Sequence, residues 1–268
     1  MARIDIIDTS ALAYKTIWNE RTYLVRLALI PILIKLACYI FALSAGFEDN
    51  ILRLSLCLTP GYFAEGWMLS HLVRLIVLNQ RWPFRPSGET AQDIACLKDR
   101  ASGITAGTLS YVLINLFIAG FMSGLMSFGP HETDPAQVSP VALLIALTGF
   151  VLSIWGFKYI WLFIPMAVRA SPFDYLTAVR GSMASFPLIG VWIMCFMPPV
   201  AAMLLFSGLV AMPFTHEGEI PQLVYFLTII VRVIFDTVKA IVCTTGLTLA
   251  IHALFNPDTR RQDEDFDW

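Results

Sequence analysis

The residues of this sequence best suited to specific chemistry are charged side chains placed inside otherwise apolar stretches. They are Lys35, Glu65, Arg232, Asp236 and Lys239. A charged group in the hydrocarbon core of a bilayer is costly, so such groups usually pair with one another or line a polar path. Pairing would hold helices together, whereas a lining would serve an ion or a small solute. Both interpretations stay open from the sequence.

The spacing of these residues predicts which charges can meet. Asp236 follows Arg232 by four residues and precedes Lys239 by three. This spacing places all three on one stripe of a helix and allows ion pairs along it. Lys35 and Glu65 lie near the middles of two successive apolar stretches, and adjacent antiparallel helices would let them neutralise each other. We therefore treat the five residues as a candidate intramembrane polar cluster.

No catalytic motif accompanies these charges. The sequence contains no HExxH, GxSxG, GxxxxGK[ST] or GxGxxG pattern, each of which would indicate a particular enzyme or nucleotide site. Glu65 and Asp236 belong to different apolar stretches, so no carboxylate pair stands at a spacing typical of acid–base catalysis. We predict no catalytic residue and expect a non-enzymatic protein.

Metal and cofactor sites are not predicted either. The five cysteines are scattered and form no CxxC pair, which is typical of small apolar fillers rather than of a zinc site or a disulfide framework. The four histidines are widely separated, and His131 and His216 fall in two polar loops. We interpret these two as ordinary loop residues and predict no cofactor and no metal.

Composition decides the class of protein. Of the 268 residues, 57% are hydrophobic and 14% are charged, whereas soluble domains have about 25% charged residues. The sequence therefore predicts an all-α, multi-pass membrane protein. The net charge of −2 and the lack of a concentrated basic stretch argue against a nucleic-acid partner. The lipid bilayer is the expected partner, with other membrane proteins as further candidates, and the sequence leaves the oligomeric state open.

Six apolar stretches predict six transmembrane helices within one membrane domain of residues 1–255. About 20 apolar residues suffice to cross the hydrocarbon core. Pro60 is expected to bend the second span, and Pro198 with Pro199 to kink the fifth. Helical periodicity predicts amphipathic surface helices at 9–22, within the polar segment 79–102, and at 172–186. The predicted spans are about 23–46, 52–78, 104–128, 141–168, 187–212 and 233–254, with 221–231 as a lead-in to the last and 256–268 as an acidic tail.

The basic residues predict the orientation of these spans. With the N-terminus in the cytoplasm, nearly all basic residues of the polar segments fall on the cytoplasmic side, as the positive-inside rule requires. The three opposite turns, 47–50, 129–140 and 214–221, contain no Lys or Arg. We expect both termini in the cytoplasm.

The spacing of the outer turns favours an internal repeat. The turns begin near residues 46, 129 and 214 and so recur about every 84 residues. The segments Ser10-x-x-x-Tyr14-x-Thr16 and Ser171-x-x-x-Tyr175-x-Thr177 also match. Three repeated units of surface helix plus hairpin are one interpretation, and even spacing by chance is the other.

Small residues in the third predicted span suggest where helices approach closely. Gly120 and Gly124 form a GxxxG pattern, which allows helix backbones to pack at short distance. The pattern predicts helix packing within the chain, with a dimer interface as the alternative.

The end of the chain resembles known bacterial membrane families. The segment Ala253-Leu254-Phe255-Asn256-Pro257-Asp258-Thr259-Arg260-Arg261 leads from the last span into the acidic tail. It is similar to the close of YciC-like inner-membrane proteins and of the membrane domain of glycerophosphodiester phosphodiesterases. Ser171–Pro187 resembles their amphipathic helix, whereas Asn256-Pro257 departs from their aromatic or aliphatic residues. The resemblance implies a multi-pass fold in a bacterial-type inner membrane, and no phosphodiesterase activity is carried over.

These observations lead to two functional hypotheses. The first is a non-enzymatic protein with a structural, assembly or envelope-maintenance role, acting through contacts with lipid or partner proteins. The alternative is a small transporter or channel subunit that uses the five charged residues as a polar lining. A solvated cavity beside Glu65 and Asp236 would favour the alternative, and sealed ion pairs in a tight bundle would favour the first.

Overall fold

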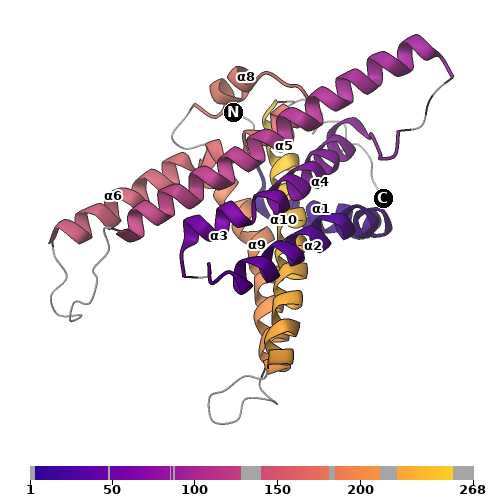
Figure 1. The fold of residues 1–268 in the computed structure, drawn as a ribbon. Helices are drawn as coiled ribbons and strands as arrows, with labels where there is room; N and C mark the ends of the chain where they lie inside the picture. Colours follow the sequence, from indigo (N-terminus) through magenta and orange to yellow (C-terminus); the bar gives the residue numbers. More distant parts are fainter. Residues whose placement is uncertain are drawn as a thin grey trace.

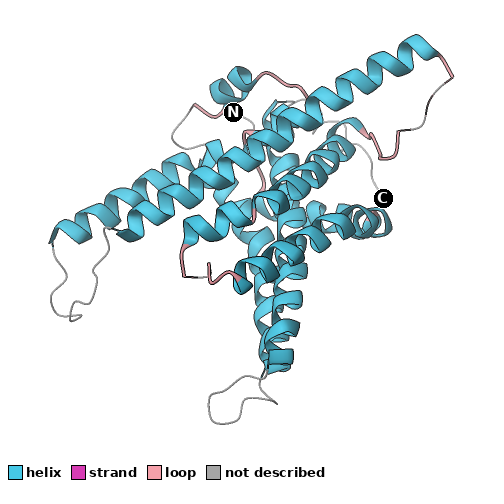
Figure 2. Ribbon diagram, viewed as in Figure 1, coloured by secondary structure: helices cyan, strands magenta, loops and turns pink. Residues whose placement is uncertain are grey.

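The computed structural model confirms the predicted all-α fold. Every regular element in the described part of the chain is a helix (Figure 2). The predicted outer turns 129–140 and 214–221, with their two histidines, lie outside the described residues apart from Pro140, as does the tail 256–268. The structure describes residues 4–47, 49–84, 86, 88–127, 140–180, 185–211 and 222–255.

The first two helices meet close to the predicted boundary between a surface helix and a span. Helix α1 covers Ile6–Asn19 and α2 covers Arg21–Ser44. The Asp5 carboxylate caps α1 by accepting hydrogen bonds from the backbone N–H groups of residues 7 and 8, at 3.0 and 3.1 Å. Such a cap satisfies donors that have no partner inside the helix.

The predicted span 52–78 is divided into two helices, α3 (Ile51–Cys57) and α4 (Thr59–Leu78). The break falls at Leu58, and Pro60 occupies the first turn of α4. A proline there costs no hydrogen bond, because the first backbone N–H groups of a helix are unpaired anyway. Pro60 therefore begins a helix, and the span is interrupted beside Pro60, close to where a bend was predicted.

Helix α5 (Thr90–Ser127) joins two elements that the sequence had separated. The predicted surface helix within 79–102 and the predicted span 104–128 form one uninterrupted helix of 38 residues. At 1.5 Å per residue it is about 57 Å long. No proline interrupts residues 90–127, so the chain has no local reason to break where its composition changes.

The predicted span 141–168 is interrupted. It consists of α6 (Pro140–Gly156), the 3-10 helix η1 (Phe157–Trp161) and the short α7 (Phe163–Ala167). Within the range 172–186 predicted as a surface helix, α8 covers Pro172–Ala178, Ser171 caps it, and α9 begins at Ser185, while residues 181–184 lie outside the described residues. Apolar length alone therefore overestimated the continuity of the predicted span 141–168.

The last two helices are long and continuous, and α10 begins earlier than the predicted span 233–254. Helix α9 covers Ser185–Ala211 and runs through Pro198 and Pro199 without a break. Helix α10 covers Gln222–Phe255 in 34 residues, about 51 Å in length. The predicted lead-in 221–231 is therefore, from residue 222, the first part of α10 itself.

The helices form two long antiparallel pairs and a central group. Figure 1 shows α6 beside α5, α9 beside α10 along another direction, and α2 and α4 between them. Helix α10 contacts α1, α2, α4 and α9, and its residues 241–248 are buried without interruption. Helix α4 is similarly enclosed between Met68 and Leu75. These two helices therefore form the centre of the molecule.

Four stretches of the described chain are long and apolar enough to cross a membrane. They are Arg21–Ser44, Thr90–Met126, Leu147–Ala167 and Ser185–Leu209. Large apolar side chains such as Leu113 and Phe117 of α5 and Leu205 of α9 are more than half exposed, as lipid-facing residues are. The structure thus indicates a membrane protein with four candidate spans. The other two predicted spans, 52–78 and 233–254, coincide with the charge-bearing central helices.

Candidate functional site

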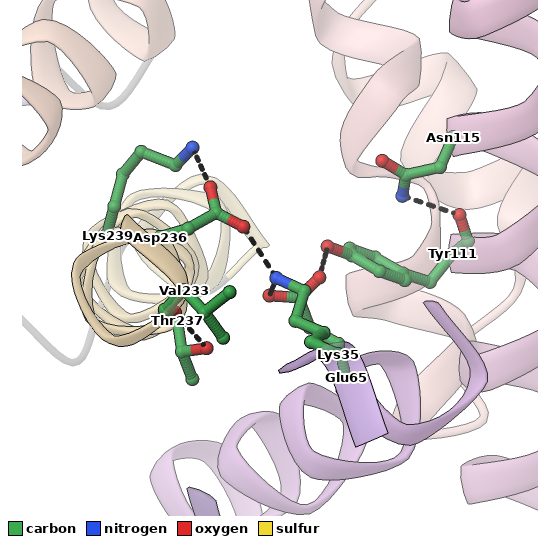
Figure 3. Close-up of polar contacts among 8 residues, drawn as sticks. All are labelled: Lys35, Glu65, Tyr111, Asn115, Val233, Asp236, Thr237 and Lys239. Atoms are coloured by element: carbon green, nitrogen blue, oxygen red, sulfur yellow. Dashed lines mark hydrogen bonds and ion pairs between the residues drawn. The ribbon is translucent and has the colours of Figure 1, made fainter. Parts of the chain in front are cut away.

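Four charged side chains form a continuous chain of ion pairs at the centre of the molecule (Figure 3). The Lys35 ammonium donates to Glu65 Oε1 at 2.7 Å and to Asp236 Oδ2 at 2.6 Å. The Lys239 ammonium pairs with the other oxygen of Asp236. The predicted pairing of Lys35 with Glu65 and of Asp236 with Lys239 is present. The chain holds two ammonium groups and two carboxylates, so its charges balance.

The chain of ion pairs begins on α2 and extends to α4 and α10. Lys35 reaches the other two helices because its side chain passes close to the backbone of α4 at Gly61, where no Cβ stands in the way. A Cβ added at Gly61 would stand only 3.0 Å from Lys35 Cγ. Asp236 and Lys239 lie one turn apart on α10, so both face the same side of that helix. The glycine and the turn spacing together bring distant parts of the sequence to one point.

The two ends of this row of ion pairs differ in solvent exposure: Lys35 and Glu65 form the inner pair, and Asp236 and Lys239 form the outer pair. The side chains of Lys35 and Glu65 are each 3% exposed, whereas those of Asp236 and Lys239 are 30% and 32% exposed. A buried charge is tolerated only when it is paired and hydrogen-bonded. The inner pair of Lys35 and Glu65 therefore holds α2 and α4 together, and the outer pair of Asp236 and Lys239 remains accessible to a ligand.

The outer pair, Asp236 and Lys239, borders a cavity of about 480 Å³. This volume lies in the range of about 300–1,000 Å³ that is common for small-molecule sites. All four charged residues line it, together with aromatic rings from several helices. The aromatic wall consists of Tyr39, Tyr62, Tyr111, Trp161, Phe163, Trp192 and Phe196. The Lys239 ammonium lies 5.8 Å from the ring centre of Phe196, within reach of a cation–π interaction.

Arg232 departs from the prediction. The sequence spacing allowed it to pair with Asp236, but among the described residues it makes no ion pair. Its guanidinium carbon lies 5.8 Å from the ring centre of Tyr39 instead. Asp236 already has an ammonium group on each oxygen, so a third cation would gain little. Arg232 therefore stands beside the polar cluster and outside its chain of ion pairs.

Two polar residues of α5 complete the site and were not predicted. The Tyr111 hydroxyl donates to Glu65 Oε2 at 2.7 Å, and the Asn115 amide donates to the Tyr111 carbonyl oxygen at 2.9 Å. The Glu65 carboxylate thus has a partner on each oxygen. A tyrosine and an asparagine one turn apart in an apolar span are the signal that could have indicated them.

A second buried charge, Arg74 of α4, also escaped prediction. Its side chain is fully buried, with its guanidinium donating to Asp99 at 2.7 Å and to the Ala167 carbonyl at 3.0 Å. Asp99 also pairs with Arg169 at 2.9 Å. These contacts tie α4 to α5 and α7 and involve no cavity, so we regard them as structural.

The fold and the site define an all-helical membrane protein with a polar cluster beside an internal cavity. Within the described ranges, no group of three or more His, Cys, Asp or Glu side chains could hold a metal ion. No family model, curated protein or solved structure matches this chain. The resemblance to YciC-like proteins and to the phosphodiesterase membrane domain therefore stays a prediction.

Proposed function

We propose that this is a non-enzymatic membrane protein that binds and passes a small zwitterionic solute. The observation that carries the proposal is the cavity of about 480 Å³ beside the half-open pair of Asp236 and Lys239. We give the transporter or channel hypothesis precedence over a purely structural role, because a cavity large enough for a small molecule borders these residues.

The chemistry of the outer pair suits a solute that carries both charges. A carboxylate of the solute could accept from Lys239 while its ammonium group meets Asp236, so that the internal pair is exchanged for two external ones. Aromatic faces such as that of Phe196 would also attract the positive group. A solute with only a positive charge would leave Lys239 without a partner, and one with only a negative charge would leave Asp236 with Lys35 alone.

Thermal unfolding of the purified protein tests this proposal. The probes are the proteinogenic L-amino acids and glycine betaine, because they are small zwitterions. We expect at least one probe to raise the Tm of the parent protein, as a ligand of the native state must. Lys239→Met should weaken that ligand roughly tenfold, since a lost charge-assisted hydrogen bond costs on the order of 1.5–3 kcal/mol.

Lys98→Met is the matched control, because Lys98 is exposed on α5 and outside the cavity. It should leave the response unchanged. If Lys239→Met and the parent protein respond equally to every probe, the outer pair is not the binding site. Uptake of the active probe into proteoliposomes then separates transport from binding alone.

A structural or assembly role is the second candidate. The sealed pair of Lys35 and Glu65 favours it, because a 3% exposed ion pair holds helices and cannot readily meet a solute. Affinity purification in mild detergent would test it. A stoichiometric partner protein that is retained by Lys239→Met, together with no effect of any probe, would favour assembly over solute binding.

We further propose six spans with both termini in the cytoplasm of a bacterial-type inner membrane. The arrangement adds α3–α4 and the C-terminal part of α10 to the four candidate spans. It is supported by the basic residues of the polar segments and by the lack of Lys and Arg in the three opposite turns. Three repeated hairpins remain part of this proposal on the spacing of those turns.

A further inference from the structure

A basic pocket lies away from the polar cluster, where the corner between α1 and α2 faces the segment that connects α4 to α5. Its volume is about 1080 Å³. Three arginines line it, Arg26, Arg81 and Arg100, against the single carboxylate of Glu20 among its lining residues. Glu20 is already paired with Arg81 at 2.5 Å. The pocket therefore carries excess positive charge and suits an anion.

Arg26 is the residue that most needs a partner. It lies five residues into the candidate span Arg21–Ser44, about 8 Å along the helix. It is exposed, its neighbours Val25 and Leu29 are exposed apolar residues, and no described residue forms an ion pair with it. An arginine at this depth is stable when it reaches phosphate groups at the membrane surface.

Arg100 presents a second, more rigid charge. It is 5% exposed, and its guanidinium donates to the carbonyl oxygen of Arg81 at 2.6 Å. This contact ties α5 to the connecting segment and fixes both arginines at the pocket. The backbone N–H of Trp82 donates to the Tyr23 hydroxyl at 3.0 Å, which ties the same segment to α2. Tyr and Trp side chains are typical of the membrane–water interface.

An apolar groove continues directly from this basic pocket. The groove has a volume of about 790 Å³ and lies between α2 and α4, with Ile34, Pro60, Phe63 and Ala64 among its lining residues. Ile30 and Trp67 line both the pocket and the groove. The two spaces therefore share a wall. The basic pocket lies at the ends of α2 and α4, and the apolar groove runs along these two helices.

We propose that the basic pocket and the apolar groove together bind one anionic phospholipid. Its phosphate would lie among Arg26, Arg81 and Arg100, and one acyl chain would lie along the groove past Ile30 and Phe63. This pattern of a cationic end joined to an apolar channel matches the two ends of a phospholipid. Free phosphate would use the basic pocket alone. The proposal is independent of the solute proposed for the central cavity.

The full-length protein in mild detergent, titrated with dioleoyl phosphatidylglycerol and followed by native mass spectrometry, tests this inference. We expect one retained lipid per chain, with dioleoyl phosphatidylcholine bound more weakly. Arg26→Gln should lower the affinity for phosphatidylglycerol roughly tenfold, through loss of a charge-assisted hydrogen bond. Ala64→Phe should lower it by filling the groove, without changing any charge.

Arg53→Gln is the control, because Arg53 is an exposed arginine of α3 that lines neither space. Equal losses for Arg26→Gln and Arg53→Gln would reduce the binding to general surface charge and overturn the site. Unchanged binding in Ala64→Phe would overturn the acyl groove. Full displacement of the lipid by sodium phosphate would indicate a site for the free anion and overturn the assignment to a phospholipid.

Discussion

Lys35 is the residue on which the ion-paired chain depends, because its ammonium group contacts two carboxylates from two other helices. Removing it would leave Glu65 with only the hydroxyl of Tyr111 and Asp236 with only Lys239. Breaking a buried ion pair from one side costs more than the pair contributes, since the remaining charge stays buried without compensation. The same reasoning says that removing both charges of a pair should cost less than removing one.

We predict that Lys35→Met lowers the free energy of unfolding by about 3 kcal/mol. The double variant Lys35→Met/Glu65→Gln should recover part of that loss, because no uncompensated carboxylate then remains on α4. Denaturant unfolding in detergent, followed by tryptophan fluorescence, measures both values. Lys98→Met should stay within about 0.5 kcal/mol of the parent protein. A double variant less stable than Lys35→Met would contradict the pairing argument.

Close helix contacts occur at glycines that the sequence pattern did not single out. A Cβ added at Gly103 would lie 2.5 Å from both the Ala167 carbonyl oxygen and Arg74 Nη1. A Cβ at Gly120 or Gly124 would meet nothing within 4 Å in the described part of the chain. Among the described residues the GxxxG pattern therefore marks no close contact, and both predictions, packing within the chain and a dimer interface, stay predictions. Helix α5 meets α4 and α7 at Gly103, Gly107 and Tyr111 instead.

We predict that Gly103→Ala destabilises the protein by about 1–3 kcal/mol, because the methyl group must displace a backbone carbonyl and the buried Arg74. Gly120→Ala should be neutral or slightly stabilising, since alanine favours a helix over glycine by roughly 1 kcal/mol. The two Tm values in the same detergent provide the comparison. Equal Tm values for both variants would show that the contact between α5 and α7 is looser than described.

The molecule as a whole separates a polar centre from an apolar exterior. Helices α2, α4 and α10 carry the ion-paired charges, while α5, α6 and α9 expose large apolar side chains such as Phe117 and Phe150. The buried core around the polar cluster is largely apolar as well, so the difference from a soluble protein lies in the apolar exterior, as expected where lipid is the surrounding solvent. The proposed six-span topology follows from that arrangement together with the distribution of basic residues.

We predict that reporter proteins fused to the C-terminus will show that this terminus lies in the cytoplasm. A C-terminal green fluorescent protein should fluoresce in intact bacterial cells, whereas alkaline phosphatase at the same position should be inactive. A phosphatase fusion after residue 135, in an outer turn, should be active and serves as the control. Active phosphatase at the C-terminus would contradict an even number of spans with the N-terminus inside.

The sequence by itself determined the class of fold, the positions of most helices and the pairing of Lys35 with Glu65. Apolar length, periodicity and spacing are local properties, and they suffice for these predictions. The change of composition near residue 103 wrongly suggested a boundary inside α5, and the break at Leu58 was not located, because tertiary contacts can override local propensity.

Only the tertiary structure decided that Asp236 pairs with Lys35 and that Arg232 stays outside the ion pairs. It also decided that the Tyr111 hydroxyl binds the second oxygen of Glu65. The physical reason is distance along the polypeptide, because 201 residues separate Lys35 from Asp236. Their contact depends on how α2 packs against α4 at Gly61 and how both pack against α10, a property that no local pattern records. The cavity beside them has the same origin, since it is the space that these crossing helices leave between their side chains.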